Sequence, residues 1–152
     1  MLTINLVCVG NLKEKFWKDA QEEYKKRLSR FCMLNIIELK EENELGQIDK
    51  ILEIEGQSIL KTVRGKTYLL AIEGKEFSSE QLAKEIESSS LQNSQLSFVI
   101  GSSYGVSKQV KQKMPNQISF GRATFPHNMA RIMLLEQIYR SFMINSGAKY
   151  HK

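Results

Sequence analysis

Two glycine-containing segments have the composition of ligand-binding loops. Residues 101–105, Gly-Ser-Ser-Tyr-Gly, come directly after the apolar run Leu96–Ile100 and before a helical pattern. Glycine permits close backbone approaches, so such a loop can present amides and carbonyls to a nucleotide-like ligand. The spacing matches neither the dinucleotide-binding nor the Walker pattern, and taken alone such a segment is more often only a turn.

The second segment, Phe120–His127, supports the binding interpretation because it also follows a strand-like run. Gly121 permits unusual backbone angles, and Pro126 suits the first turn of a helix. Phe120 and Phe125 can supply apolar walls for a ligand, with ordinary core packing as the plainer alternative. Together the two loops predict a site that reads the edge of an adenine.

The last residues combine three side-chain types that can act on RNA. Tyr150 offers an aromatic face, His151 an imidazole that titrates near neutral pH, and Lys152 a cation. Solvent exposure without function is the plainer explanation of this composition. Because chain ends usually pack against little, we expect the tail to contribute little to folding.

These segments need a scaffold, and strand-like and helix-like patterns alternate along the chain. Capping residues Ser78 and Ser107 and apolar residues at helical spacing predict helices between the strands and a long one at Asn128–Ile144. Apolar runs predict strands at Leu2–Val9, Leu34–Leu39, Thr67–Ile72, Leu96–Ile100 and Gln117–Phe120. The alternation predicts an α/β fold, a mostly parallel sheet with helices on both faces and ligands at the carboxyl ends of its strands.

Length and composition indicate one cytosolic domain spanning residues 1–152. The chain is 41% hydrophobic, and no Pro-rich linker or repeat divides it. No apolar run is long enough for a bilayer, and Met1–Gly10 lacks the features of a secretory leader, so we expect no membrane contact. Cys8 and Cys32 have no Cys or His at metal-ligand spacing, which favours buried free thiols over a disulfide or metal site.

The net charge of +5 is concentrated in the last third of the chain. Residues 101–152 hold 8 Lys and Arg and a single acid, Glu136, whereas residues 1–100 hold 14 basic and 16 acidic residues. A local basic excess fits a polyanionic partner such as RNA, because phosphate contacts release counterions. A merely solvated surface fits the charge equally well.

The predicted helix Asn128–Ile144 has apolar residues on all sides. At 100° per residue its Met, Ile, Leu, Tyr and Phe side chains leave no broad polar face. Such a helix needs cover, and we expect a homodimer in which it forms part of the interface. Complete burial in the core of one subunit is the alternative.

The chain resembles the ribosomal RNA large-subunit methyltransferase H family, which belongs to the SPOUT superfamily, over essentially its whole length. The segments that carry the resemblance are Val7–Lys13, Phe98–Gly101 with Tyr104-Gly105, Thr124–His127, Glu136–Arg140 and Tyr150–Lys152. The resemblance implies a SPOUT fold with a deep trefoil knot near the C-terminus, a homodimer, and S-adenosylmethionine (SAM) held in the knot. It further implies methylation of N3 of a pseudouridine in 23S ribosomal RNA of the assembled ribosome.

The family's functional residues map onto two groups of positions in this chain. Arg140, Tyr150 and His151 match positions implicated in catalysis, and Arg140 and Lys152 match RNA-binding positions. No metal is implied. The cofactor contacts fall on Ile72, Gly101, Phe120, Gly121, Arg122, Ala123, Thr124 and Phe125.

The sequence departs from the family pattern at Ser102, where a second glycine is usual, and at Lys149, where proline is usual. We expect Ser102 to be tolerated unless the backbone there has a positive φ. The family's reaction requires an imide nitrogen to lose its proton, and we expect His151 rather than His127 to be the base. The alternatives are a non-catalytic ribosome-binding or RNA-binding protein and a SPOUT methyltransferase with another RNA target.

Overall fold

The structure, a computed structural model, describes residues 1–42 and 46–152. Every predicted strand and helix is present within the described residues, and most bounds agree to within a few positions. The elements in chain order are β1 (Thr3–Val9), α1 (Lys15–Leu28), β2 (Met33–Leu39), α2 (Ile48–Thr62), β3 (Lys66–Glu76), α3 (Ser79–Gln92), β4 (Gln95–Ile100), α4 (Lys108–Lys113), β5 (Gln117–Ser119) and α5 (His127–Asn145).

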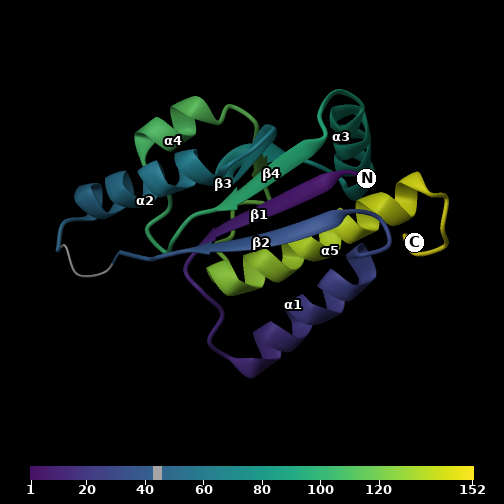
Figure 1. The fold of residues 1–152 in the computed structure, drawn as a ribbon, viewed down its shortest axis with the longest axis horizontal. Helices are drawn as coiled ribbons and strands as arrows, with labels where there is room; N and C mark the ends of the chain where they lie inside the picture. The colour runs from purple at the N-terminus through teal and green to yellow at the C-terminus, as the bar shows by residue number, and fades with distance from the viewer. Residues whose placement is uncertain (43–45) are drawn as a thin grey trace.

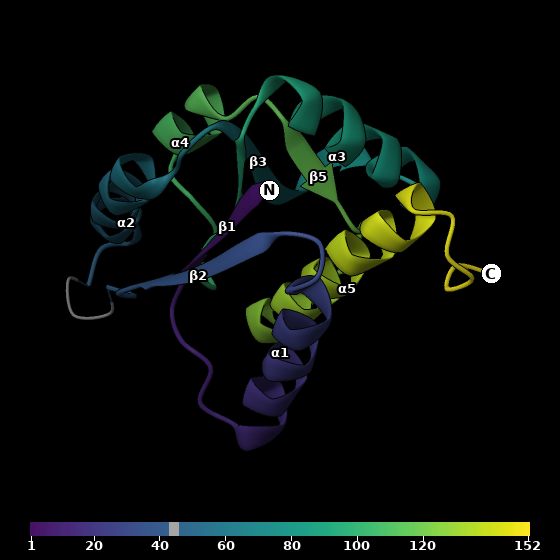
Figure 2. The same ribbon diagram turned by 45° about the vertical axis from the view of Figure 1, so that its right-hand side comes forward.

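The strands form one sheet in the order β2-β1-β4-β3-β5, and every pair of neighbours is parallel. Helices α1, α3 and α5 cover one face, and α2 and α4 cover the other (Figures 1 and 2). Parallel strands joined by helical crossovers require this arrangement, because each crossover must return along a face of the sheet. The predicted α/β fold is therefore confirmed. The trefoil knot stays a prediction.

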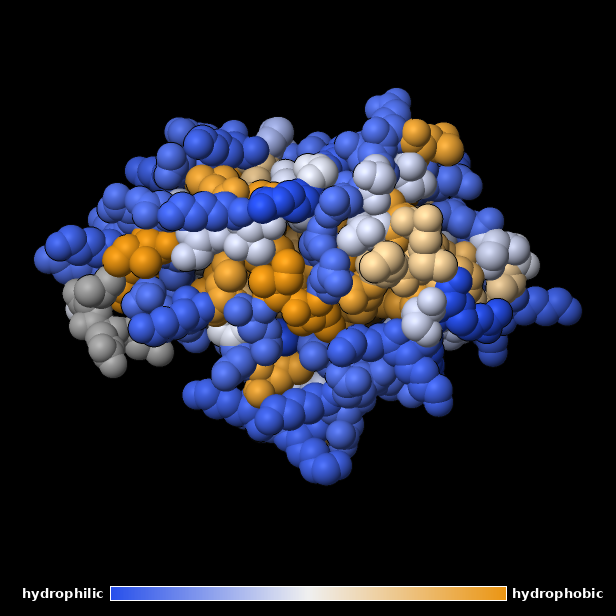
Figure 3. All heavy atoms as spheres, in the orientation of Figure 1, coloured by the Kyte–Doolittle hydropathy of each residue, from blue (hydrophilic) through white to orange (hydrophobic). Residues whose placement is uncertain are grey.

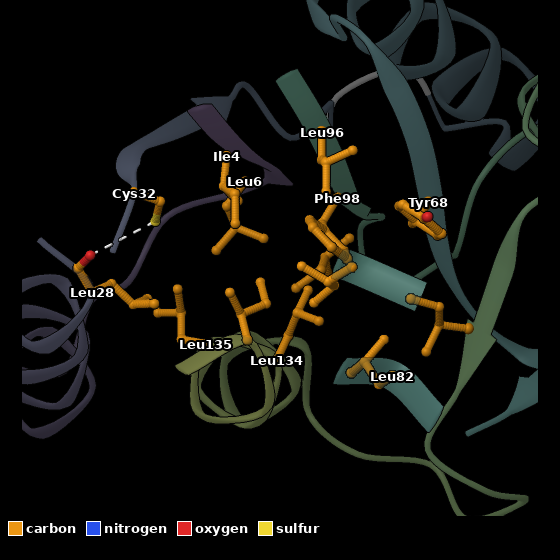
Figure 4. Packing of buried hydrophobic residues seen from close by; sticks show 14 of the residues in the cluster. Ile4, Leu6, Leu28, Cys32, Tyr68, Leu82, Leu96, Phe98, Leu134 and Leu135 are labelled. Atoms are coloured by element: carbon orange, nitrogen blue, oxygen red, sulfur yellow. Dashed lines mark hydrogen bonds between the residues drawn. The ribbon is translucent and has the colours of Figure 1, made fainter. Parts of the chain in front are cut away.

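Two apolar layers follow from the alternation of side chains along the strands. Ile4 and Leu6 of β1 point to the face covered by α1, α3 and α5, whereas Val7 and Val9 belong to the other layer. Figure 4 shows Leu134 and Leu135 of α5 packed beneath the β1 and β4 side chains. The core thus fixes α5 against the sheet.

Local capping positions two helices as the sequence predicts. The Ser78 hydroxyl accepts a hydrogen bond from the backbone N–H of Gln81, whose side chain accepts one from Ser78 N–H, which completes a capping box at α3. Ser107 accepts a hydrogen bond from Val110 N–H at the start of α4. Among the described residues, no helix is long and apolar enough to cross a membrane.

Strand β3 differs from the prediction, because it continues to Glu76 instead of ending at Ile72. Its pairing with β5 shifts between Leu70 and Lys75, so the intervening residues bulge from the ladder. A Cβ at Gly74 would lie 2.8 Å from the Gln117 carbonyl carbon, so only glycine lets the two strands approach there. The bulge leaves the Ile72 side chain half exposed.

Candidate functional site

A cavity of about 570 Å³ lies at the carboxyl end of β4, beside the bulged part of β3 and the segment after β5. It has the size and position expected for a ligand site in a parallel α/β fold. Arg122 is exposed and does not line it. The other predicted cofactor contacts all do: Ile72, Gly101, Phe120, Gly121, Ala123, Thr124 and Phe125.

The loop after β4 folds tightly on itself. The Gly105 N–H donates to the Ser102 carbonyl at 2.8 Å, and the two residues form an isolated antiparallel bridge. A Cβ at Gly101 would lie 2.6 Å from the Gly105 carbonyl oxygen and 2.7 Å from Val106 Cγ1. Glycine at 101 is therefore required by the loop itself, and a larger side chain there would distort the loop before it reached a ligand.

Ser102 makes a side-chain hydrogen bond that the family's usual glycine at this position could not make. Among the described residues only glycines have positive φ, so the backbone at Ser102 is unstrained. Its hydroxyl donates to Glu55 Oε1 at 2.9 Å, and Glu55 Oε2 accepts from the Glu42 N–H at 3.0 Å. Glu55 on α2 is buried and thereby links the glycine loop to the segment after β2. Sequence reasoning did not identify Glu55.

Ser119 connects β3 to the loop after β5, and sequence reasoning missed it as well. Its hydroxyl donates to the Ile72 carbonyl at 2.7 Å and accepts from the Gly121 N–H at 3.0 Å. Gly121 has a φ of +111°, which strongly favours glycine. One buried hydroxyl thus holds two of the predicted cofactor contacts in place.

The cavity also carries a charged pair. Lys111 Nζ lies 2.8 Å from Glu73 Oε1, and both residues line the cavity. The hydrogen bond from Lys111 lowers the pKa of the Glu73 carboxyl below its usual value. Both groups are largely exposed, so their pairing contributes little to stability.

A buried arginine, Arg131, holds the start of α5 in place near the cavity. Arg131 is 1% exposed, and its guanidinium donates to Glu38 Oε2 at 2.8 Å, to Gln21 Oε1 at 3.0 Å and to the Gly10 carbonyl at 3.3 Å. These bonds join α5 to α1, β2 and the loop after β1. Removing Glu38, the one charged partner among the described residues, would leave the buried guanidinium without an ion pair, which typically costs about 3–5 kcal/mol.

The predicted catalytic residues gather at the far end of α5. Arg140 Nη1 lies 3.0 Å from His151 Nδ1, and His151 Nε2 lies 2.6 Å from Glu80 Oε1. Arg140 also forms an ion pair with Glu136 at 2.6 Å, and its guanidinium carbon lies 4.8 Å from the centre of the Tyr150 ring. Lys152 is exposed at the chain end.

The expectation that the tail packs against little is wrong. The Tyr150 ring meets the Tyr139 ring edge-on, with their centres 5.0 Å apart, and the Tyr150 N–H bonds back to the Ala148 carbonyl across Lys149. Rings in such contact contribute about 0.5–1.5 kcal/mol beyond their buried area. Removing the tail should therefore cost some stability.

The two groups of predicted site residues lie apart within the chain. His127 lines the cavity, and Arg140 follows it by thirteen residues on the same helix. At about 1.5 Å per residue, the axial separation is roughly 20 Å. The structure therefore assembles a cofactor-type cavity and a catalytic-type cluster, but not beside one another.

A second hollow, of about 590 Å³, lies along the outer side of α5. Its apolar lining includes Trp17 from α1 and Met129, Ile132 and Met133 from α5. The α5 side chains thus divide between the core and this groove. Among the described residues, nothing donates a hydrogen bond to the buried Glu136 Oε2 at the groove.

Both cysteines are free and buried, in agreement with the sequence. Burial raises the pKa of the Cys8 thiol to about 12 and that of the Cys32 thiol to about 12. Neither is suited to nucleophilic chemistry. Within the described residues, no group of three or more His, Cys, Asp or Glu side chains could hold a metal ion.

Comparison with known proteins agrees with this geometry. The family described as predicted SPOUT methyltransferase matches residues 2–151. A Lactobacillus acidophilus protein named ribosomal RNA large subunit methyltransferase H is 47% identical over 99% of this chain and 100% of its own length. Proteins of the same name from Lactobacillus helveticus and Streptococcus pneumoniae are each 46% identical with the same coverage. The chain belongs to the SPOUT methyltransferases and, among them, to the family of ribosomal RNA large subunit methyltransferase H.

Proposed function

We propose that this chain, acting as one domain over residues 1–152, is a SAM-dependent methyltransferase of 23S ribosomal RNA. The proposed target is N3 of a pseudouridine in the assembled ribosome, which places the protein in the cytoplasm. The observation that carries the proposal is the cavity at the strand ends, which brings together the predicted cofactor contacts except Arg122. Membership of a methyltransferase family supports it.

The cavity lining suits SAM. Ile72, Phe120 and Phe125 offer apolar walls for the faces of an adenine, and the backbone near Gly101 and Gly121 offers polar groups for its edge. When bound, SAM supplies an electrophilic methyl group. The work left to the protein is to align that group with the target nitrogen and to exclude water.

We propose that the cluster at the end of α5 acts on the RNA. Arg140 and Lys152 bind phosphate or stabilise the developing anion, Tyr150 stacks on the target base, and His151 accepts the imide proton. Both ring nitrogens of His151 are engaged, by Arg140 and by Glu80. Action as a base therefore requires the tail to shift when RNA arrives and to free one nitrogen.

The separation of the two groups supports a homodimer. If two copies pack with their α5 helices antiparallel, the tail of one subunit lies near the cavity of the other. The apolar groove beside α5 is suitable for such an interface, because obligate interfaces resemble a core cut in half.

Ribosomes from a strain that lacks this protein provide the test. Incubation with purified protein and labelled SAM should label one nucleotide, and mapping should find it to be an N3-methylated pseudouridine. The Ala123→Trp variant, which places an indole in the cavity, is the control and should give no label. Tight ribosome binding without label or SAM affinity would indicate a non-catalytic factor. Label at another nucleotide would indicate a different RNA target.

A further inference from the structure

The end of α1 lies beside the tail and carries arginines stacked on aromatic rings. We propose that Arg27 and Arg30, with the rings they cover, form a second contact surface for the ribosomal RNA, continuous with the α5 end and the tail. This inference rests on the proposed function. We call Arg27, Arg30, Tyr24, Phe31, Tyr139 and Tyr150 the arginine–aromatic surface.

The rings of this surface touch one another. The ring centres of Tyr24 and Tyr139 are 6.3 Å apart, those of Phe31 and Tyr139 are 6.2 Å apart, and Tyr150 meets Tyr139 at 5.0 Å. Tyr139 therefore connects α1 to the tail. A contact surface that includes the tail extends without a break onto α1.

The arginines lie over these rings. The Arg27 guanidinium carbon is 5.3 Å from the Tyr24 ring centre and 5.6 Å from that of Tyr139, and the corresponding distance from Arg30 to Phe31 is 5.6 Å. A guanidinium held against a ring is oriented by it and keeps N–H donors available at its edges. That geometry suits bidentate bonds to phosphate, which Lys cannot make.

The charge of the α1 end favours a polyanion. Its last turn contains Lys25, Lys26 and Arg27, and Arg30 follows two residues beyond the helix. Lys25 and Arg27 pair with Glu22 and Glu23, but these pairs are solvent-exposed and weak. Within the described part of the chain, Arg30 forms no ion pair. Figure 3 shows mostly hydrophilic residues, with one hydrophobic patch among them, on the part of the molecule that contains α1.

Stabilisation of the helix dipole explains only part of this arrangement. Cations in a last turn interact favourably with the helix C-terminus, which accounts for Lys25–Arg27. It does not account for an exposed arginine beyond the helix or for the rings beneath both guanidiniums. Aromatic faces interleaved with arginines are the composition that stacks bases and binds the backbone of single-stranded RNA.

The test compares ribosome binding of the wild type, Arg27→Gln/Arg30→Gln, Arg27→Lys/Arg30→Lys and the control Lys50→Gln/Lys61→Gln. The control removes the same charge from exposed positions on α2, across the sheet. Binding is measured between about 50 and 200 mM salt, because log K falls with log salt and each lost phosphate contact lowers the magnitude of that negative slope by about 1. SAM affinity and molar mass are measured for each variant.

For Arg27→Gln/Arg30→Gln we expect the slope to be smaller in magnitude by about 2 and binding to be at least about tenfold weaker near 100 mM salt. KM for ribosomes should rise more than kcat falls, and SAM affinity should match that of the wild type. The lysine variant should keep the slope but bind more weakly than the wild type, because it keeps the charges and loses the stacked geometry. Arg30→Gln alone should lower the magnitude of the slope by about 1. Because Arg30 is exposed, this single variant keeps the test valid even if the double variant folds poorly.

Equal slopes for the glutamine variant and the control would overturn this inference and leave the proposed function intact. A fall in molar mass for the glutamine variant would also overturn it, since the surface would then be a contact between two copies of the chain. If the wild-type protein neither binds ribosomes nor transfers a methyl group to their RNA, both the proposed function and this inference are wrong.

Discussion

A dimer built from two differently damaged subunits should methylate ribosomes at about half the wild-type rate. One subunit carries Ala123→Trp, which places an indole in the cavity and leaves the tail intact. The other ends at Ala148, which removes Tyr150, His151 and Lys152 and leaves the cavity intact. If the tail of each subunit serves the cavity of its partner, the heterodimer keeps one complete site of two, and a two-fold dimer loses about half its rate.

The dimensions of α5 make the opposite arrangement hard to satisfy. From His127 at the cavity to Asn145 the helix extends about 27 Å, at 1.5 Å per residue. The six residues from Asn145 to His151 span at most about 20 Å when fully extended. Arg140 is fixed on the helix and cannot move with the tail. To reach the cavity of its own subunit, His151 would have to leave Arg140 and Glu80, and the tail would have to extend almost fully along α5.

The assay requires co-expression of the two chains with different affinity tags and purification over both tags in turn. Each damaged homodimer must be inactive, and calorimetry should show that the Ala123→Trp homodimer does not bind SAM. An inactive heterodimer made of folded subunits would refute the reasoning, because each subunit would then use its own tail. Wild-type turnover by the homodimer ending at Ala148 would show that the tail plays no part in catalysis.

Three further predictions follow from single contacts. Ile72→Asp should weaken SAM binding by at least about tenfold, or 1.4 kcal/mol. The control Ile48→Asp, at an equally exposed position away from the cavity, should leave SAM binding unchanged. Equal calorimetric affinities for the two variants would exclude Ile72 from the cofactor site. Ser102→Ala should lower the free energy of unfolding in urea by about 1–3 kcal/mol, because it leaves Oε1 of the buried Glu55 without a donor. Ser102→Gly should not tighten SAM binding; tighter binding by more than tenfold would show that serine obstructs the loop. Burial raises the pKa values of Cys8 and Cys32 to about 12, and only the thiolate is nucleophilic. Both thiols should therefore resist iodoacetamide in the folded protein at pH 8 and react with it in urea. Rapid labelling of either thiol in the native protein would contradict the burial.

The fold could be predicted from the sequence because its signals are local and periodic. Apolar runs that end at glycine or polar residues predicted the strands, and the capping box at Ser78 predicted the start of α3 to the residue. The one clear error, the end of β3, occurs where the β3–β5 pairing is irregular and Gly74 interrupts the apolar pattern. Glycine inside a strand signals such a bulge, so that error was avoidable.

The polar contacts that hold the cavity in shape could not be predicted in the same way. Ser102 bonds to Glu55 and Ser119 bonds to Ile72, and in both pairs the partners are 47 residues apart. A buried serine or glutamate in a sequence has no period and no spacing that marks its partner. The resemblance to a family supplied positions for ligand contacts but not the residues that orient them.

The separation of cavity and tail, in contrast, follows from elements that the sequence does reveal. A helix that begins directly after the last parallel strand begins at the carboxyl edge of the sheet, where the cavity lies, and must run back toward the amino edge. Nineteen helical residues carry the chain about 28 Å, so whatever follows α5 lies at the opposite edge, and Figure 1 shows α5 running back toward the end of the sheet where β1 begins. For a tail that acts on methyl transfer, this separation favours a site completed by a second subunit, whichever of the tail's side chains proves to be the base.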